Sequence, residues 1–115
     1  MVENVDSVVL KLKSSSYTPL LGVVLQAVSR AAFGKGLERH AGAFSFMKQP
    51  WYRSAHLFGW GFLLGQADKK ISESLSLSPE ESINELLDAI VYLGMAIIVQ
   101  KEALEKTKTR SDHEL

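Results

Sequence analysis

One stretch of the sequence, residues 78–100, limits the fold more than any other because it predicts a helix with a defined start and an apolar second half. Ser78 suits the N-cap, Pro79 suits the first helical position, and Glu81 stands where a capping box places a carboxylate. Residues 89–99 leave no polar face on this helix, which must therefore be covered on all sides. Because a chain of 115 residues seldom covers a helix fully by itself, we expect self-association, preferably as a dimer.

The composition is that of a globular chain and argues against several kinds of partner. Hydrophobic residues make up 46% and charged residues 23%, and the formal net charge is zero, so we expect neither duplex nucleic acid nor a membrane surface as a partner. There is no cysteine and no apolar signal segment, and the apolar run at 89–99 is too short to cross a bilayer. These features predict a cytoplasmic protein with one helical domain over residues 1–106.

The two ends of the chain are harder to assign. The valines and leucines of residues 5–13 fit one face of a helix, but from residue 8 onward they also alternate with lysines as in a strand. Their β-branched members favour a short N-terminal strand, which would have to pair with another copy of the chain. At the other end, charges alternate and apolar content falls, which predicts a fraying helix and a disordered tail at 107–115.

Two further helices are expected before the central one. The first runs from Thr18 to about residue 33, with Gln26, Ser29 and Arg30 toward solvent. The second covers about residues 52–74. It carries two glycines four residues apart, Gly61 and Gly65, which permit close approach of another helix. Together with the central helix, these segments predict an all-α fold, an antiparallel bundle of three or four helices.

Three carboxylates in the central helix form the one group with chemical promise. Glu81, Glu85 and Asp88 share a stripe at helical spacing and would supply hard oxygen ligands suited to Mg²⁺ or Mn²⁺. Acidic residues are also common at helix starts, where the macrodipole favours them. Lys69 and Lys70 could instead neutralise the two later carboxylates, and both interpretations stay open on spacing alone.

The sequence Glu85-Leu86-Leu87-Asp88, followed by an apolar run, resembles the E-x-x-D helix of the all-α nucleoside triphosphate pyrophosphohydrolases, the MazG-like family. The resemblance covers about residues 44–98. It implies a MazG-like bundle that assembles as a dimer or a dimer of dimers. In that family the motif binds Mg²⁺ together with a glutamate-rich motif on the preceding helix.

The glutamate-rich motif is not present in this chain. Alignment of the preceding helix through Gly65 places Phe62, Leu63 and Gln66 where the family has glutamates. The resemblance therefore implies a protein that binds a nucleotide or a similar small ligand, with pyrophosphohydrolase activity weakened or lost. The alternatives are an active Mg²⁺-dependent nucleoside triphosphate pyrophosphohydrolase and a non-catalytic oligomerisation or protein-interaction module.

In the family chemistry, a Mg²⁺-assisted water attacks the α-phosphate of the nucleotide and pyrophosphate is released. The resemblance implies that Glu85 and Asp88 would be the retained metal ligands and Glu81 an auxiliary one. Lys69 or Lys70 would contact phosphate.

Aromatic residues gather around the irregular segment at residues 35–51, and they either belong to the core or line a pocket that stacks a base. The short connection at residues 75–77 must make the flanking helices antiparallel, which brings the two lysines beside the carboxylates. A ligand would then lie between the polar end of the second helix and the carboxylate stripe of the central helix, under the irregular segment. The aromatic side chains of Trp51, Trp60 and Tyr92 would form its apolar part.

Overall fold

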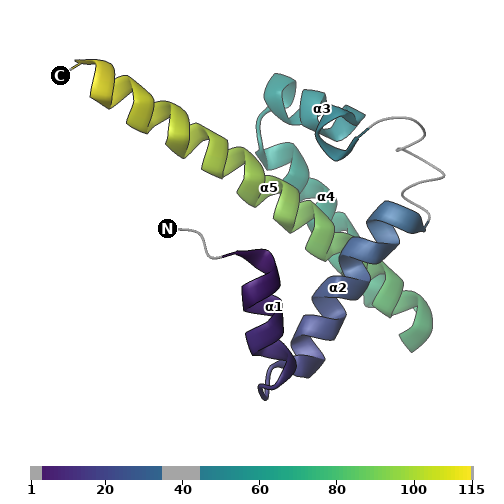
Figure 1. Ribbon diagram of the computed structural model, residues 1–115. Coiled ribbons are helices and arrows are strands. Elements are labelled where there is room, and N and C mark those ends of the chain that lie inside the picture. The colour runs from purple at the N-terminus through teal and green to yellow at the C-terminus, as the bar shows by residue number, and fades with distance from the viewer. Residues whose placement is uncertain (1–3, 35–44, 115) are drawn as a thin grey trace.

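The computed structural model describes residues 4–34 and 45–114, and every element in these ranges is helical (Figure 1). The elements in order are α1 (Val5–Lys13), α2 (Thr18–Phe33), the 3₁₀ helix η2 (Phe46–Lys48), α3 (Pro50–Phe58), α4 (Gly61–Ser74) and α5 (Pro79–Glu114). The all-α class is confirmed. The described part of the chain holds five α-helices, more than the three or four that the sequence predicts.

Residues 5–13 form a helix, so the predicted N-terminal strand is wrong. The side chain of Asn4 caps this helix by accepting a hydrogen bond from the Ser7 N–H at 3.2 Å. Asp6 lies in the first turn, and Lys11 and Lys13 lie in the last, an order that suits the helix macrodipole. These end effects outweigh the weak preference of valine for strands.

The predicted helix at 52–74 is divided into α3 and α4 at Gly59. This residue has φ 87° and ψ 158°, a backbone conformation that is essentially restricted to glycine, and the chain turns there. Gly61 and Gly65 do not serve the predicted close helix contact, because a Cβ atom built on either would meet no atom within 4 Å. The glycine with a structural role is Gly59, where the positive φ divides the helix.

The core forms where α4 lies along α5. The two helices are joined by a short connection and run antiparallel, while α2 crosses α5 on another side and α3 lies over one end of α4 (Figure 1). The buried cluster comprises Trp51, Ala55, Leu63, Met95, Ala96 and Val99. Leu63 has no exposed surface. The core therefore depends mainly on α3, α4 and the middle of α5.

A partly buried polar contact also joins α3 to α5. The Tyr52 hydroxyl donates a hydrogen bond of 2.6 Å to Oε2 of Glu102. The pKa of Tyr52 is raised, first by this hydrogen bond, because ionisation would place two negative charges side by side.

The helix α5 continues through residues 107–114, which the sequence assigns to a disordered tail. The turns just before these residues, 101–106, consist of good helix formers, and local side-chain contacts follow them. The hydroxyls of Thr107 and Thr109 donate to the carbonyls of Ala103 and Glu105, each at 3.0 Å. The end of α5 extends beyond the other helices as a continuous rod (Figure 1).

The apolar part of α5 is longer than the run at 89–99. By length and composition alone, the region Pro79–Arg110 contains a window apolar enough to cross a membrane, and 22% of that window is buried. The core helix of a soluble protein meets the same criterion but is mostly buried. Much of the apolar surface of α5 is therefore not covered by the rest of this chain.

We predict that alanine has opposite effects at two glycines. Gly59→Ala should lower the free energy of unfolding by about 1–3 kcal/mol because alanine is strained at that φ and ψ. Gly65→Ala should raise it by about 0.5–1 kcal/mol, because it lies inside α4 with open space for a methyl group. Urea unfolding followed by circular dichroism gives both values, and a loss at both positions would contradict the assigned backbone.

Candidate functional site

Asp88 of α5 lies between two basic side chains that come from different helices. The Nε atom of Arg30, on α2, donates a hydrogen bond of 2.8 Å to Oδ1 of Asp88, and its Nη2 lies 3.5 Å from Oδ2. The Nζ atom of Lys70, on α4, is 3.5 Å from the same Oδ2. One carboxylate thus connects α2, α4 and α5.

Glu85 completes the group, one turn before Asp88. Its Oε2 atom lies 3.2 Å from Nζ of Lys70, an ion pair without the geometry of a hydrogen bond. The side chains of Arg30, Lys70, Glu85 and Asp88 are each between 19% and 26% exposed. We call these four residues the charge cluster; with two cations and two anions, it is neutral overall.

The charge cluster favours the ionised form of both basic groups. Burial lowers the pKa of Lys70, but the close contact with Glu85 and the negative charges of Glu85 and Asp88 together outweigh burial and leave this pKa raised. The hydrogen bond to Asp88 raises the pKa of Arg30 against the opposing effect of burial. Both cations therefore stay charged beside the carboxylates at neutral pH.

Glu81 has a different role from the two later carboxylates. Its N–H donates to the Ser78 hydroxyl oxygen at 3.4 Å, which is one half of the predicted capping box, and that hydroxyl in turn donates to Oε1 of Glu81 at 3.3 Å. In the ranges that the structure describes, no three or more histidine or acidic side chains are grouped to hold a metal ion. Glu85 and Asp88 are each paired with cationic side chains, although Oε2 of Glu85 makes no hydrogen bond, and this pairing does not fit a divalent cation between them.

The two adjacent lysines also differ. The side chain of Lys69 is 67% exposed and lies 4.0 Å from Glu73 in the next turn of α4, away from the charge cluster. Lys70, by contrast, contacts both predicted carboxylates. The sequence leaves open whether Lys70 contacts a phosphate or neutralises the carboxylates. In the structure it pairs with Glu85 and Asp88.

Arg30 is the member of the charge cluster that the sequence interpretation misses, because it assigns this residue to the solvent side of its helix. The signal that would have found it is the neighbouring Ala27, which has no exposed surface and lies three residues earlier on the same face of α2. A small residue one turn away lets the two helices approach closely enough for the guanidinium to reach Asp88.

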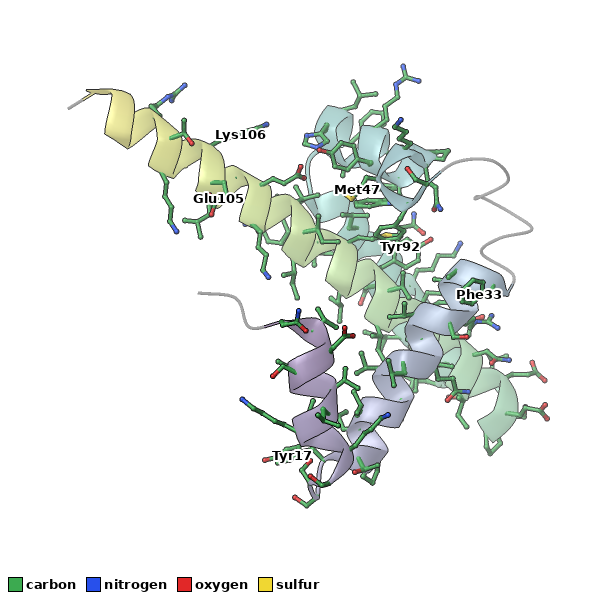
Figure 2. All side chains as sticks on the ribbon, viewed as in Figure 1. Tyr17, Phe33, Met47, Tyr92, Glu105 and Lys106 are labelled. Atoms are coloured by element: carbon green, nitrogen blue, oxygen red, sulfur yellow. The ribbon has the colours of Figure 1, made fainter. Side chains whose placement is uncertain are left out.

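An aromatic pocket lies beside the charge cluster. It has a volume of about 180 Å³ and is lined by Gln49, Pro50, Trp51, Ser54, Phe62, Tyr92 and Met95. Tyr92 follows Asp88 by one turn of α5 and extends toward the side where Met47 of η2 lies (Figure 2). Trp51 is held in place by a hydrogen bond of 2.8 Å from its indole N–H to the carbonyl of Phe46.

The structure therefore divides the predicted ligand-binding residues. Trp51 and Tyr92 share the aromatic pocket, and Lys70 lies in the adjoining charge cluster. Trp60 instead lines a separate open groove between α4 and α5, with Leu64 and Leu93 among its neighbours. The predicted roof of the site falls partly on residues 35–44, which lie outside the described residues.

No family model matches this chain, and neither a curated protein nor a solved structure matches it.

We predict that the two lysines differ in their effect on stability. Lys70→Met should lower the free energy of unfolding by about 1–3 kcal/mol at pH 7, because it leaves two partly buried carboxylates short of a cation. The matched variant Lys69→Met should cost less than about 0.5 kcal/mol, because the pair that it removes is exposed. Equal effects in urea unfolding would contradict the charge cluster.

The contribution of Lys70 should also disappear at high pH. Its pKa is raised above the ordinary value of 10.5, so its stabilising effect is complete below that value and is lost as the pH rises through the higher folded-state pKa. The difference in unfolding free energy between the unsubstituted protein and Lys70→Met should therefore narrow above pH 10.5. A difference that stays constant into this range would count against the pairing.

Proposed function

We propose that this chain is a MazG-like helical protein that binds a nucleotide or a similar small ligand with a planar ring, and that its pyrophosphohydrolase activity is weakened or lost. The proposal rests on the resemblance of the Glu85-x-x-Asp88 helix and on the aromatic pocket that lies beside this motif. The pocket is the observation that carries it.

The size and lining of the pocket suit a single ring system. About 180 Å³ is less than the roughly 300–1,000 Å³ of sites that enclose drug-sized ligands, and it is close to the roughly 150 Å³ of an engineered cavity that accepts benzene. Trp51, Phe62 and Tyr92 offer faces on which a base can stack. Gln49 and Ser54 offer polar groups for its edge, so a base would enter the pocket while the rest of a nucleotide stayed outside.

The phosphates of such a nucleotide would extend toward the charge cluster, because Tyr92 and Asp88 are one turn apart on α5. Lys70 and Arg30 are the cations there, but both are already paired with carboxylates. Phosphate would have to compete with Glu85 and Asp88 for them. We therefore expect the base to contribute more to affinity than the phosphates do.

Loss of hydrolysis follows from the same contacts. A metal-dependent reaction needs carboxylates that can be shared with the cation, whereas Lys70 and Arg30 neutralise Glu85 and Asp88. The positions of the first family motif hold Phe62, Leu63 and Gln66, and Leu63 is fully buried in the core. These positions therefore supply no carboxylate with which to complete a metal site.

We predict that filling the aromatic pocket abolishes ligand binding. Among nucleosides and nucleoside triphosphates, at least one should raise the melting temperature of the unsubstituted protein by a few degrees at millimolar concentration, because binding stabilises only the folded state. Ser54→Leu, which places an apolar side chain in the pocket, should remove this shift. Arg53→Leu, on the same helix but outside the pocket lining, should retain it.

The same screen separates the alternative functions. Our proposal predicts equal shifts with and without Mn²⁺ and little or no release of pyrophosphate. Pyrophosphate release that is abolished by Glu85→Gln would instead establish an active hydrolase. Flat melting curves with every ligand would reject nucleotide binding and favour a purely structural or partner-binding role.

A further inference from the structure

One side of α5 carries apolar residues at alternating spacings of three and four along the sequence. These are Ile83, Leu86, Ile90, Leu93, Ile97 and Leu104, with Gln100 at the remaining position. Apolar residues at this average spacing of 3.5 are the pattern by which two helices pack side by side in a coiled coil. We call this set the α5 seam.

Most of the α5 seam is left uncovered by the other helices, although Ile90 is only partly exposed. Ile83, Leu86, Leu93, Ile97 and Leu104 are each between 41% and 57% exposed. At about 100° per residue, the centre of the seam lies more than a quarter turn from Glu85 and from Asp88, which mark the sides that face α4 and α2. A second helix could therefore lie along the seam without displacing either neighbour.

The total surface of the chain is also too large for a compact monomer. Its accessible surface is 8760 Å², whereas a folded monomer of 12.7 kDa exposes about 6,200 Å². Its radius of gyration is 16.5 Å, against about 13 Å for a compact chain of 115 residues. Exposed residues of α1 and α2 supply part of this excess of about 2,500 Å², which still leaves room for the roughly 1,000–2,500 Å² that each subunit buries in an obligate dimer.

We propose that the α5 seam is the interface with a second copy of this chain, whose own seam packs against it in antiparallel orientation. The groove beside the seam would receive the partner's side chains. It has a volume of about 440 Å³, and Trp60, the N-cap residue of α4, forms its wall with Leu64, opposite Leu93, Ile97 and Leu104. This interface does not depend on the proposed function, since the aromatic pocket uses other residues.

Charge favours a copy of this chain and fixes the orientation. The net charge of zero gives two copies no overall repulsion. Glu80 and Lys108 flank the seam on the same side at its opposite ends, so an antiparallel pair places Glu80 of one copy beside the partner's Lys108. It also opposes the two helix dipoles. A parallel pair would gain neither effect.

A lipid bilayer fits the apolar surface of α5 less well than a second copy does. The charge cluster lies within the apolar stretch of this helix, and α4, which packs along it, carries Asp68, Lys69 and Glu73. Burying α5 in hydrocarbon would take these charges with it, at a cost of several kcal/mol.

Light scattering with mass determination tests the interface in the intact chain. At tens of micromolar we expect twice the mass of 12.7 kDa. Ile97→Lys should halve that mass, because it puts a charge at the centre of the seam. Val28→Lys, on α2, is the matched variant, because Val28 is 58% exposed and Ile97 57%. It should remain dimeric because Val28 lies outside the seam. A monomeric unsubstituted protein, or dissociation by Val28→Lys alone, would overturn the proposal.

Because the chain lacks cysteine, introduced thiols report the orientation. Leu93→Cys, at the centre, should form a disulfide-linked dimer on mild oxidation. Leu104→Cys should do so only when Ile83→Cys is present in the same chain. Efficient cross-linking of Leu104→Cys alone would overturn the antiparallel arrangement.

Flotation of the unsubstituted protein with vesicles of phosphatidylcholine and phosphatidylglycerol would overturn the choice of a second copy over lipid. Ligand-induced melting shifts in Ile97→Lys report separately on the proposed function.

Discussion

The carboxylate of Asp88 is the point on which the arrangement of the helices depends. It accepts from Arg30 of α2 at 2.8 Å and lies 3.5 Å from Lys70 of α4, so one side chain of α5 sets the position of both neighbours. Apolar packing between α4 and α5 supplies most of the buried surface but is non-directional. The ion pairs add the directional contacts, which fix how α2 crosses α5 and which face of α4 is turned inward.

The same pairs shape what the site can do. A carboxylate pair that is held by a guanidinium and an ammonium group forms a neutral support for an adjacent pocket, and it attracts a further cation only weakly. The aromatic pocket next to it keeps its walls through unrelated contacts, among them the hydrogen bond from Trp51 to the Phe46 carbonyl. Glu85 and Asp88 therefore join α5 to its neighbouring helices. Under the function proposed above, the pocket beside them is the part that binds a ligand.

Much of the fold follows from local signals in the sequence. The capping box at Ser78 and Glu81 and the all-helical class are visible in residue order alone. Two features could not be read in this way. The break at Gly59 depends on which of several nearby glycines takes a positive φ, and the role of Arg30 depends on a contact 58 residues along the chain. The α1 helix does not follow from the valines, because their spacing fits a helix and a strand equally. The residue that indicates a helix is Asn4, whose side chain caps its N-terminus.

The central claim is that Arg30 and Asp88 interact directly and stabilise the fold as a pair. A double-mutant cycle tests it, with urea unfolding of the unsubstituted protein, Arg30→Met, Asp88→Asn and the double variant. A direct pair predicts a coupling energy of about 1–3 kcal/mol, with the double variant losing less stability than the two single variants together. Losses that add within about 0.5 kcal/mol would show that the two side chains act independently, and would contradict the account.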